Sequence, residues 1–397
     1  MTCRPSPCRL AALALSTALA AGSLGCIDEL KESPERTRTL ETRLQQAVDA
    51  ALASGEVYNA TVRVVAPRRF VYASASGGEA DPDQHIRMTS RTRFRIFSIA
   101  KPMTAALVLR LWERGRLDLD APVADYLDDR DVDFDRLHVF KGRSYGRTIT
   151  VRQLLQHRSG LPDWFADGPV DANGLTGFVR LTLSLGPELW DPRDSIRYAS
   201  EHLKPFFPPG AGYHYSDTNY SLLGLLVERL TGRSLASNYR QAIFEPLHMR
   251  DTYLQYFEPP PSEGLVSHAF LGPIDLAPVN LSVDWGGGGV VSTTEDLDRF
   301  ARALFKGDLF RSRATLDAAL DFIDVPPDQG ADGYGLGVER TTAFNTAWVG
   351  HYGFFGAMML YDRDRDISVI GTVNAYTEAF GPFVESALTA VEEELGE

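Results

Sequence analysis

The stretch from Phe97 to Trp112 constrains the fold more than any other part of the sequence. Between Met103 and Trp112 only Thr104 and Arg110 are polar. This pattern predicts a helix that is apolar nearly all round and is therefore buried. Gly115 supplies its end. The buried helix should begin at or just after a serine.

Ser98 is that serine, and Lys101 lies three residues further on, on the same face of the helix. The positive end of the helix dipole favours a nucleophilic serine, and a nearby amine takes its proton if burial disfavours the ammonium form. Only five of the 40 basic residues are lysines. A site that keeps lysine in this background needs an amine that deprotonates, which guanidinium does not do. The spacing alone fits equally well an alternative in which Ser98 only caps the helix and Lys101 is a solvated residue of its first turn.

The composition excludes several classes of protein. The chain has 397 residues, enough for one large domain or two, and its hydrophobic and charged fractions are ordinary for a globular protein. The net charge of −13 and the lack of a basic run argue against nucleic acid binding. No H-E-x-x-H motif or Cys/His cluster is present, so we expect neither a metal nor a cofactor.

Residues 1–26 have the form of an export signal. The uncharged run Leu10–Gly25 follows two arginines and is short for a membrane span. Cleavage after the A-x-A site at residues 18–20 would release a soluble protein. The sequence Ser23–Cys26 instead resembles a bacterial lipobox, which would leave Cys26 lipidated and attached to a membrane. All three cysteines lie in this segment. Cys26 therefore has no disulfide partner in the mature chain, and we favour the lipoprotein.

Beyond a charged tether at residues 27–39, strand patterns occur at both ends of the chain and helix patterns in the middle. Strands are predicted at Ala60–Ala66, Arg69–Ala75, Tyr334–Val338, Thr346–Gly350, Gly356–Tyr361 and Asp366–Val373. Helices are predicted at Leu40–Leu52, Thr150–His157, Asp194–Leu203, Thr218–Leu230, Leu235–Phe244, from Ser292 to Leu304, and Pro382–Leu395. The glycine run 286–289 indicates flexibility or close backbone approach. The pattern predicts an α/β catalytic domain over residues 40–397. Its sheet would come from about 40–116 and 286–397, with a mostly α insertion at about 117–285.

Two further polar clusters could serve a nucleophilic serine. Tyr215-Ser216-Asp217 comes just before a predicted helix, where Ser216 or Asp217 could simply be its cap. His351-Tyr352-Gly353 belongs to a predicted strand, where a lone histidine is commonly structural.

Taken in order, the motifs resemble those of the serine β-lactamase and penicillin-binding protein superfamily, in its class C and D-Ala-D-Ala carboxypeptidase branch. The order is Ser-x-x-Lys, then Tyr-x-Asn, then Lys/His-x-Gly. Residues 154–162 are similar to its LLxHxSGLP stretch, and residues 209–224 to its PGxxxxYSNxxYxLLG stretch. Segments 243–249, 288–293 and 334–337 also match. The resemblance runs from about residue 40 to the C-terminus.

This resemblance implies a β-lactamase/transpeptidase-like fold, in which an antiparallel sheet is flanked by helices. It implies that Ser98 is the acylated nucleophile, with Lys101 as its proton-accepting partner and Tyr215 passing the proton to the leaving group. The backbone N–H groups of Ser98 and Phe354 would form an oxyanion hole. His351 would stand beside Tyr215 and, with Gly353, help to bind the substrate.

Two positions depart from the family pattern. Asp217 replaces an Asn that donates to the substrate, and a carboxylate there also favours the ammonium form of Lys101. Tyr352 replaces a smaller hydroxyl residue in the substrate-binding strand. We therefore expect an envelope serine hydrolase acting on a small acyl substrate: a D-amino-acid peptide, an ester or, less readily, a β-lactam. The alternative is a non-catalytic penicillin-binding or sensor protein on the same scaffold.

Overall fold

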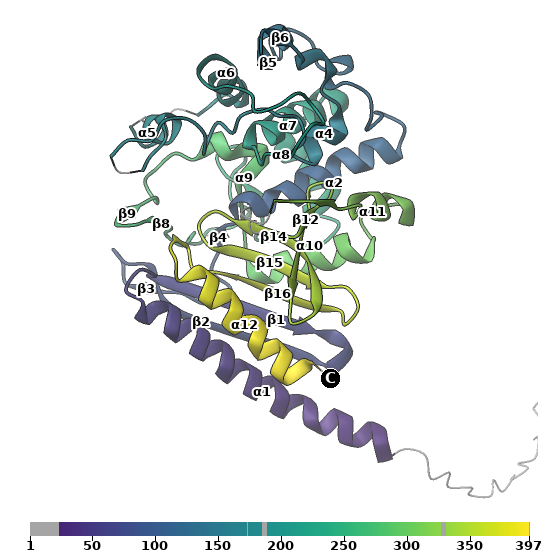
Figure 1. Ribbon diagram of the computed structural model, residues 1–397. Helices are drawn as coiled ribbons and strands as arrows, with labels where there is room; N and C mark the ends of the chain where they lie inside the picture. Colours follow the sequence, from purple (N-terminus) through teal and green to yellow (C-terminus); the bar gives the residue numbers. More distant parts are fainter. Residues whose placement is uncertain (1–23, 173, 185–188, 327–330, 397) are drawn as a thin grey trace, which may run out of the picture.

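The computed structural model describes residues 24–172, 174–184, 189–326 and 331–396 (Figure 1). In this part of the chain, nine strands form one antiparallel sheet. From edge to edge the strands are β11 (Ile323–Asp324), β12 (Gly333–Tyr334), β13 (Glu339–Ala343), β14 (Thr346–Gly353), β15 (Ala357–Asp362), β16 (Ile367–Thr372), β1 (Asn59–Ala66), β2 (Val71–Asp81) and β3 (Ile86–Arg87). Thr61 of β1 pairs with Thr372 of β16. The sheet is thus built from both ends of the chain, which confirms the predicted architecture.

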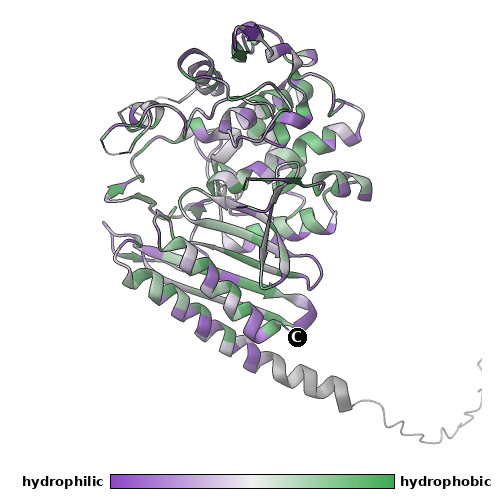
Figure 2. Ribbon diagram, viewed as in Figure 1, coloured by the Kyte–Doolittle hydropathy of each residue, from purple (hydrophilic) through white to green (hydrophobic). Residues whose placement is uncertain are grey.

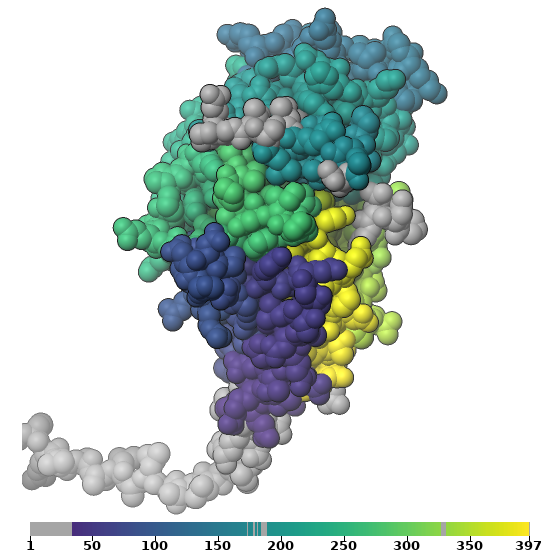
Figure 3. Space-filling model, turned by 90° about the vertical axis from the view of Figure 1, so that its left-hand side faces the viewer, coloured from purple at the N-terminus to yellow at the C-terminus, as the bar shows by residue number. Residues whose placement is uncertain are grey.

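Helices cover both faces of the sheet. Helices α1 (Leu24–Ala53) and α12 (Phe380–Leu395) pack on one face, and α10 (Thr294–Lys306) packs on the other. Residues of β15 alternate between the two faces, since Met358 packs with α1 and α12 and Met359 packs with the opposite core. Figure 2 shows the apolar side of α1 turned toward the sheet, and Figure 3 shows the two terminal helices side by side at the surface.

The helical region lies above the sheet in Figure 1. It contains α3 (Phe134–Leu137), α4 (Val151–Leu155), α5 (Gly177–Ser184), α6 (Pro192–His202), α7 (Asp217–Thr231), α8 (Leu235–Tyr239) and α9 (Trp285–Gly288). Between this region and the sheet runs α2 (Ala100–Glu113), with α11 (Arg313–Ala319) nearby. Eleven residues of α2 are buried, so the prediction of a helix enclosed nearly all round is confirmed.

Short strands complete the fold. They are β4 (Phe94–Arg95), β10 (Val290–Ser292) and β7 (Tyr253–Leu254) in one small sheet, β17 (Ala375–Tyr376), β8 (Phe270–Leu271) and β9 (Ile274–Asp275) in another, and the hairpin β5 (Val139–Phe140) and β6 (Arg143–Ser144). The first of these sheets is adjacent in the chain to Ser98, because β4 leads directly into the turn before α2.

Three local predictions need correction. The strand predicted at Tyr334–Val338 stops after Tyr334, because the chain turns at Gly337, whose φ is +82°. Strand β13, which follows, was not predicted because its sequence is largely polar. Helix α10 is capped by Thr293, whose side chain accepts from the N–H of Asp296, so its cap lies one residue after Ser292, the predicted one.

The predicted signal segment lies outside the described residues, apart from its last three residues, which begin α1. The segment interpreted as a tether is the first half of that helix. Its packing against the sheet is formed from Leu40 onward. Among the described residues, no helix is both long enough and apolar enough to cross a lipid bilayer.

Candidate active site

Ser98 lies in a single 3₁₀ turn, Phe97–Ile99, that runs directly into α2. Phe97, the residue before the serine, has a φ of +47°, an unusual conformation for a bulky side chain and one found where function constrains the backbone. The turn projects Ser98 from the start of the helix, and the spacing of three residues returns Lys101 to it. The Lys101 ammonium donates to Ser98 Oγ at 2.8 Å.

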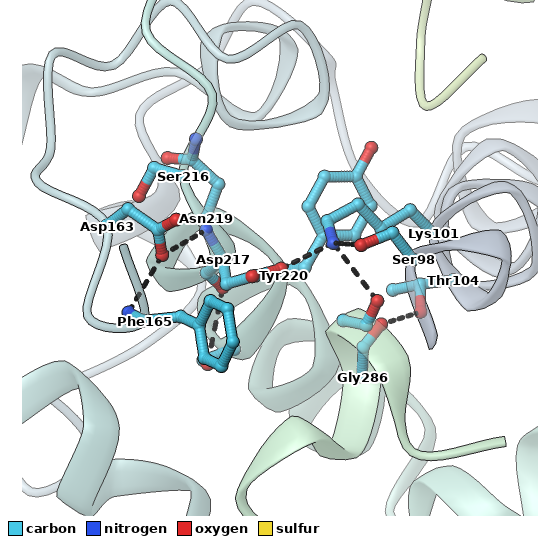
Figure 4. Close-up of polar contacts among 12 residues, drawn as sticks. Ser98, Lys101, Thr104, Asp163, Phe165, Ser216, Asp217, Asn219, Tyr220 and Gly286 are labelled. Atoms are coloured by element: carbon cyan, nitrogen blue, oxygen red, sulfur yellow. Dashed lines mark hydrogen bonds and ion pairs between the residues drawn. The ribbon is translucent and has the colours of Figure 1, made fainter. Parts of the chain in front are cut away.

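The Lys101 ammonium is fully buried and has three acceptors. Besides Ser98 Oγ, it donates to the carbonyl oxygen of Gly287 at 3.1 Å and forms an ion pair with the carboxylate of Asp217 (Figure 4). These three partners match the three N–H groups of an ammonium. The expectation that Asp217 lies within a few ångströms of Lys101 is confirmed.

The glycine run explains how these groups come so close. Residues Trp285–Gly288 form one buried helical turn, and a Cβ on Gly287 would lie 2.9 Å from Asp217 Oδ1 and 3.7 Å from Lys101 Nζ. Only glycine fits there. Of the two interpretations offered for this run, close backbone approach is the one the structure bears out.

Tyr215 lies beside the pair. Its hydroxyl faces the Ser98 side chain, and its ring centroid is 4.8 Å from Lys101 Nζ. Burial, with the nearby charges of Asp217 and Glu339, raises the pKa of Tyr215 well above its usual value. The group is therefore a phenol at neutral pH, and it holds a proton that it can donate.

Two further carboxyl groups, which the sequence did not single out, lie near the lysine. Asp163 Oδ1 accepts from the N–H groups of Phe165 and Asp217 at 3.0 and 3.1 Å. Burial and the Asp217 charge raise the pKa of Asp163 well above its usual range. The same two causes raise the pKa of Asp284 to about 7, against the lowering effect of Lys101. The only sequence signal for Asp163 was its place directly after the LLxHxSGLP stretch.

The strand predicted to bind substrate meets the serine turn at Gly353. A Cβ on Gly353 would lie 2.5 Å from the carbonyl oxygen of Ile96 and 3.3 Å from Phe97 Cβ, so the end of β14 touches the chain just before Ser98. Phe354, the next residue, lines the cavity described below. The backbone around Ser98 and that around Phe354 are thus brought together, as an oxyanion hole requires.

The side chains of the other two residues of the motif, His351 and Tyr352, do not line the cavity. Tyr352 points to the opposite face of the sheet, where its ring lies 6.0 Å from that of Phe380 in α12. The expectation that its side chain contacts substrate is corrected, because neighbouring residues of a strand face opposite sides. His351 does stand near Tyr215, with 6.2 Å between ring centroids. It is 1% exposed, however, and does not line the cavity, so it does not contact substrate directly.

His351 is also uncharged. Burial, then the Lys101 charge, lowers the pKa of His351 to about 3. Glu339 from β13 lies 3.6 Å from its Nε2 atom, and burial raises the pKa of Glu339 to about 8. At neutral pH this side of the site therefore presents no positive charge.

A cavity of about 170 Å³ opens beside Ser98. Asp163, Tyr215, Asp217 and Asp284 lie in its wall with the serine. The rest of the lining is mainly aromatic and aliphatic: Phe97, Trp164, Phe165, Ala166, Val179, Leu183, Leu271, Leu276, Leu281, Val283, Phe354 and Phe355. None of the described lining residues is Arg, Lys or His.

Comparison with known proteins agrees with this geometry. Residues 44–391 match the family model described as Beta-lactamase. Esterase EstB from Burkholderia gladioli is 29% identical over 89% of this chain and 95% of its own length. A D-stereospecific amidohydrolase from Streptomyces sp. superposes with a TM-score of 0.72 and 29% identity, over 87% of this chain and 98% of that one. A D-amino acid amidase from Ochrobactrum anthropi, at 24% identity and a TM-score of 0.72, covers 89% and 99% and shares the fold. The chain belongs to the beta-lactamase family and is a serine hydrolase.

Proposed function

We propose that the protein hydrolyses small esters, and more slowly amides, that carry an apolar group, through an acyl-enzyme on Ser98. One observation carries this proposal: the cavity beside Ser98 is apolar over most of its surface and has no cationic side chain among its described lining residues. Such a wall binds an aliphatic or aromatic group by removing it from water. It offers nothing that pairs with a substrate carboxylate.

In the proposed reaction, Ser98 Oγ attacks the carbonyl carbon of the ester and its proton passes to the Lys101–Asp217 pair. Starting from the Lys101–Asp217 ion pair, the pair accepts this proton only if Lys101 first gives one to Asp217. The backbone N–H groups of Ser98 and Phe354 bind the developing oxyanion. Tyr215 donates a proton to the departing alkoxide as the C–O bond breaks, and it regains a proton from the Lys101–Asp217 pair, which holds the one released by Ser98. Water then cleaves the ester bond to Ser98 and restores its hydroxyl.

The charges near the serine favour esters over peptides that end in a carboxylate. Asp284, with a pKa of about 7, is partly ionised at neutral pH. His351 is neutral and buried, and Lys101 is already paired with Asp217. An entering carboxylate would therefore meet the Asp284 charge, with no unpaired cation among the described lining residues to offset it. The same argument makes penicillins poor substrates. The similarity to an esterase supports the proposal.

The test is a series of p-nitrophenyl esters from acetate to hexanoate, assayed beside an N-acyl-D-Ala-D-Ala peptide and a penicillin. At about 0.8 kcal/mol for each of the four added methylenes, kcat/KM should rise up to about 200-fold along the ester series. The peptide and the penicillin should be turned over more slowly than any of the esters. Ser98→Ala provides the background rate. A flat response to chain length, or faster cleavage of the peptide, would refute the proposal.

We further propose that the protein is exported and attached to the membrane through a lipid on Cys26. The proposal rests on the uncharged run Leu10–Gly25 that ends at this cysteine and on the absence of cysteine from the rest of the sequence. In a bacterial host, Cys26→Ser should move the protein from the membrane to the soluble fraction, and mass spectrometry of the native N-terminus should find diacylglycerol on Cys26. A native N-terminus at Ala21 would establish the alternative cleavage and a soluble exported protein.

A further inference from the structure

A chain of buried hydrogen bonds joins two motifs that have no role in the reaction described above. His157 belongs to the LLxHxSGLP stretch, and Tyr334 begins the segment 334–337. His157 Nε2 lies 3.1 Å from the hydroxyl oxygen of Tyr334, and that hydroxyl lies 3.1 Å from His351 Nε2. Each of the three side chains is at most 1% exposed.

The outer contacts of the chain determine where each proton sits. The N–H of Ser216 donates to His157 Nδ1 at 3.0 Å, so His157 carries its proton on Nε2 and donates it to Tyr334. At the other end, His351 Nδ1 lies 2.7 Å from the carbonyl oxygen of Tyr352 and must donate to it. His351 Nε2 is then an acceptor, and the Tyr334 hydroxyl is its donor. Each donor therefore points the same way: His157 donates to Tyr334, Tyr334 to His351, and His351 to the carbonyl oxygen of Tyr352. Both imidazoles are neutral.

The two ends of this chain lie next to the two walls of the active site. Ser216 directly follows Tyr215, and the His157 ring is stacked on the Tyr215 ring at a centroid distance of 4.2 Å and an interplanar angle of 24°. Tyr352 directly precedes Gly353, where β14 meets the serine turn. His157 has a φ of +55°, an uncommon conformation that the surrounding contacts maintain. This row of hydrogen bonds thus connects the helical region to the sheet across the active site.

We propose that Tyr334 is a positioning residue whose hydroxyl, bridging His157 and His351, fixes Tyr215 relative to the end of β14. The inference rests on the proposed roles of Ser98 and Tyr215 in the reaction. A misplacement of about 1 Å between reacting groups lowers a rate by about 100-fold, so a brace between the two walls has a direct kinetic effect.

The surroundings keep the brace uncharged. Burial and the charge of Lys101 lower the pKa of both His157 and His351. The other titratable groups that face the two imidazoles are Glu339 from β13, His214 and Tyr215 from the loop before α7, Tyr220 from α7, and Tyr213. Of these, Glu339 is the one placed to stabilise a protonated His351, at 3.6 Å from its Nε2 atom.

The variant Tyr334→Phe keeps the ring and removes only the bridging hydroxyl. We expect kcat for an ester to fall by about 10- to 100-fold while KM changes less than about 3-fold, because the substrate cavity is untouched. With no donor at its Nε2 atom, His351 can accept the proton that Glu339, with a pKa of about 8, still holds at neutral pH 3.6 Å away. The kcat profile should therefore shift where this shared proton is lost, near pH 8. Tyr213→Phe is the matched control, because the Tyr213 ring packs 5.9 Å from the Tyr334 ring. This variant should change neither kcat nor its pH profile.

A second measurement does not depend on activity. Nitrogen-15 NMR of the imidazoles in the folded protein should find His157 protonated on Nε2 and His351 on Nδ1 at pH 7. Both tautomers should be lost in Tyr334→Phe. An imidazolium or the opposite tautomer at His351 in the wild-type protein would overturn the inference. So would a Tyr334→Phe enzyme with wild-type kcat and an unchanged pH profile. Labelling of Ser98 by a fluorophosphonate separates the two proposals, because it reports the nucleophile even if no ester is hydrolysed.

Discussion

Replacing Ser98 by alanine is expected to reduce ester hydrolysis by at least about 1,000-fold and to abolish labelling by a fluorophosphonate. The reason is geometric. In the described part of the chain, Ser98 is the serine whose Oγ receives a hydrogen bond from the buried Lys101 ammonium and contacts the Tyr215 hydroxyl. Loss of the hydroxyl removes the bond-forming atom but leaves the cavity intact, so the variant should still bind ester without turning it over.

Ser216→Ala is the matched control for this experiment. Ser216 is also a buried serine beside Tyr215, but its hydroxyl donates to the carbonyl oxygen of Pro162 at 2.9 Å. Its loss should lower the melting temperature and leave Ser98 labelled. Mass spectrometry identifies the labelled peptide in each protein. Label on a serine other than Ser98, or labelling that survives Ser98→Ala, would show that the nucleophile has been misassigned.

The variant Lys101→Arg should slow acylation by at least about 1,000-fold, although it keeps the positive charge. Guanidinium does not lose a proton at any accessible pH, so it cannot take the one that Ser98 releases. Its planar fork also fits poorly among the three acceptors that surround the Lys101 ammonium, which are Ser98 Oγ, the Gly287 carbonyl oxygen and the Asp217 carboxylate.

Lys306→Arg is the corresponding control. Lys306 ends α10 and forms an ion pair with Asp366 at 2.9 Å, and an arginine at position 306 would keep this ion pair. The measurement is the rate of fluorophosphonate labelling, with a thermal melt to establish that each variant is folded. Labelling of Lys101→Arg within about tenfold of the wild-type rate would mean that Lys101 only holds the structure together and that another group takes the proton.

The parts of the site that lie close together in the sequence were the easiest to predict. Ser98 and Lys101 meet because a helix places residues three apart on one face. The order of the motifs then indicated Tyr215 and Asp217. The contact of Asp217 with Lys101 follows from that order, because Asp217 stands where the family has a residue that faces the substrate.

Groups that enter the site from distant segments could not be predicted. Asp284 and Glu339 have ordinary sequence neighbours, and their pKa values are raised by burial and, for Asp284, also by the charge of Asp217. The side to which the Tyr352 side chain points depends on which residues of β14 face the active site. A shift of one residue in that pattern turns every side chain of the strand to the other face of the sheet. The Tyr334 bridge required the distances between two histidines that lie on different elements.

Pairing of β1 with β16 also sets the moment at which the protein becomes active during its synthesis. Thr61 has no partner in β16 until Thr372 has left the ribosome, so the sheet stays open while the roughly 300 residues between these two strands are being made. Closing so long a loop is among the slow steps of folding. Ser98 and Lys101 are made early, whereas the β14 wall that meets them at Gly353 is made late. The growing chain therefore carries its nucleophile in an incomplete site, and hydrolysis begins only once β14 and β16 have been added to it.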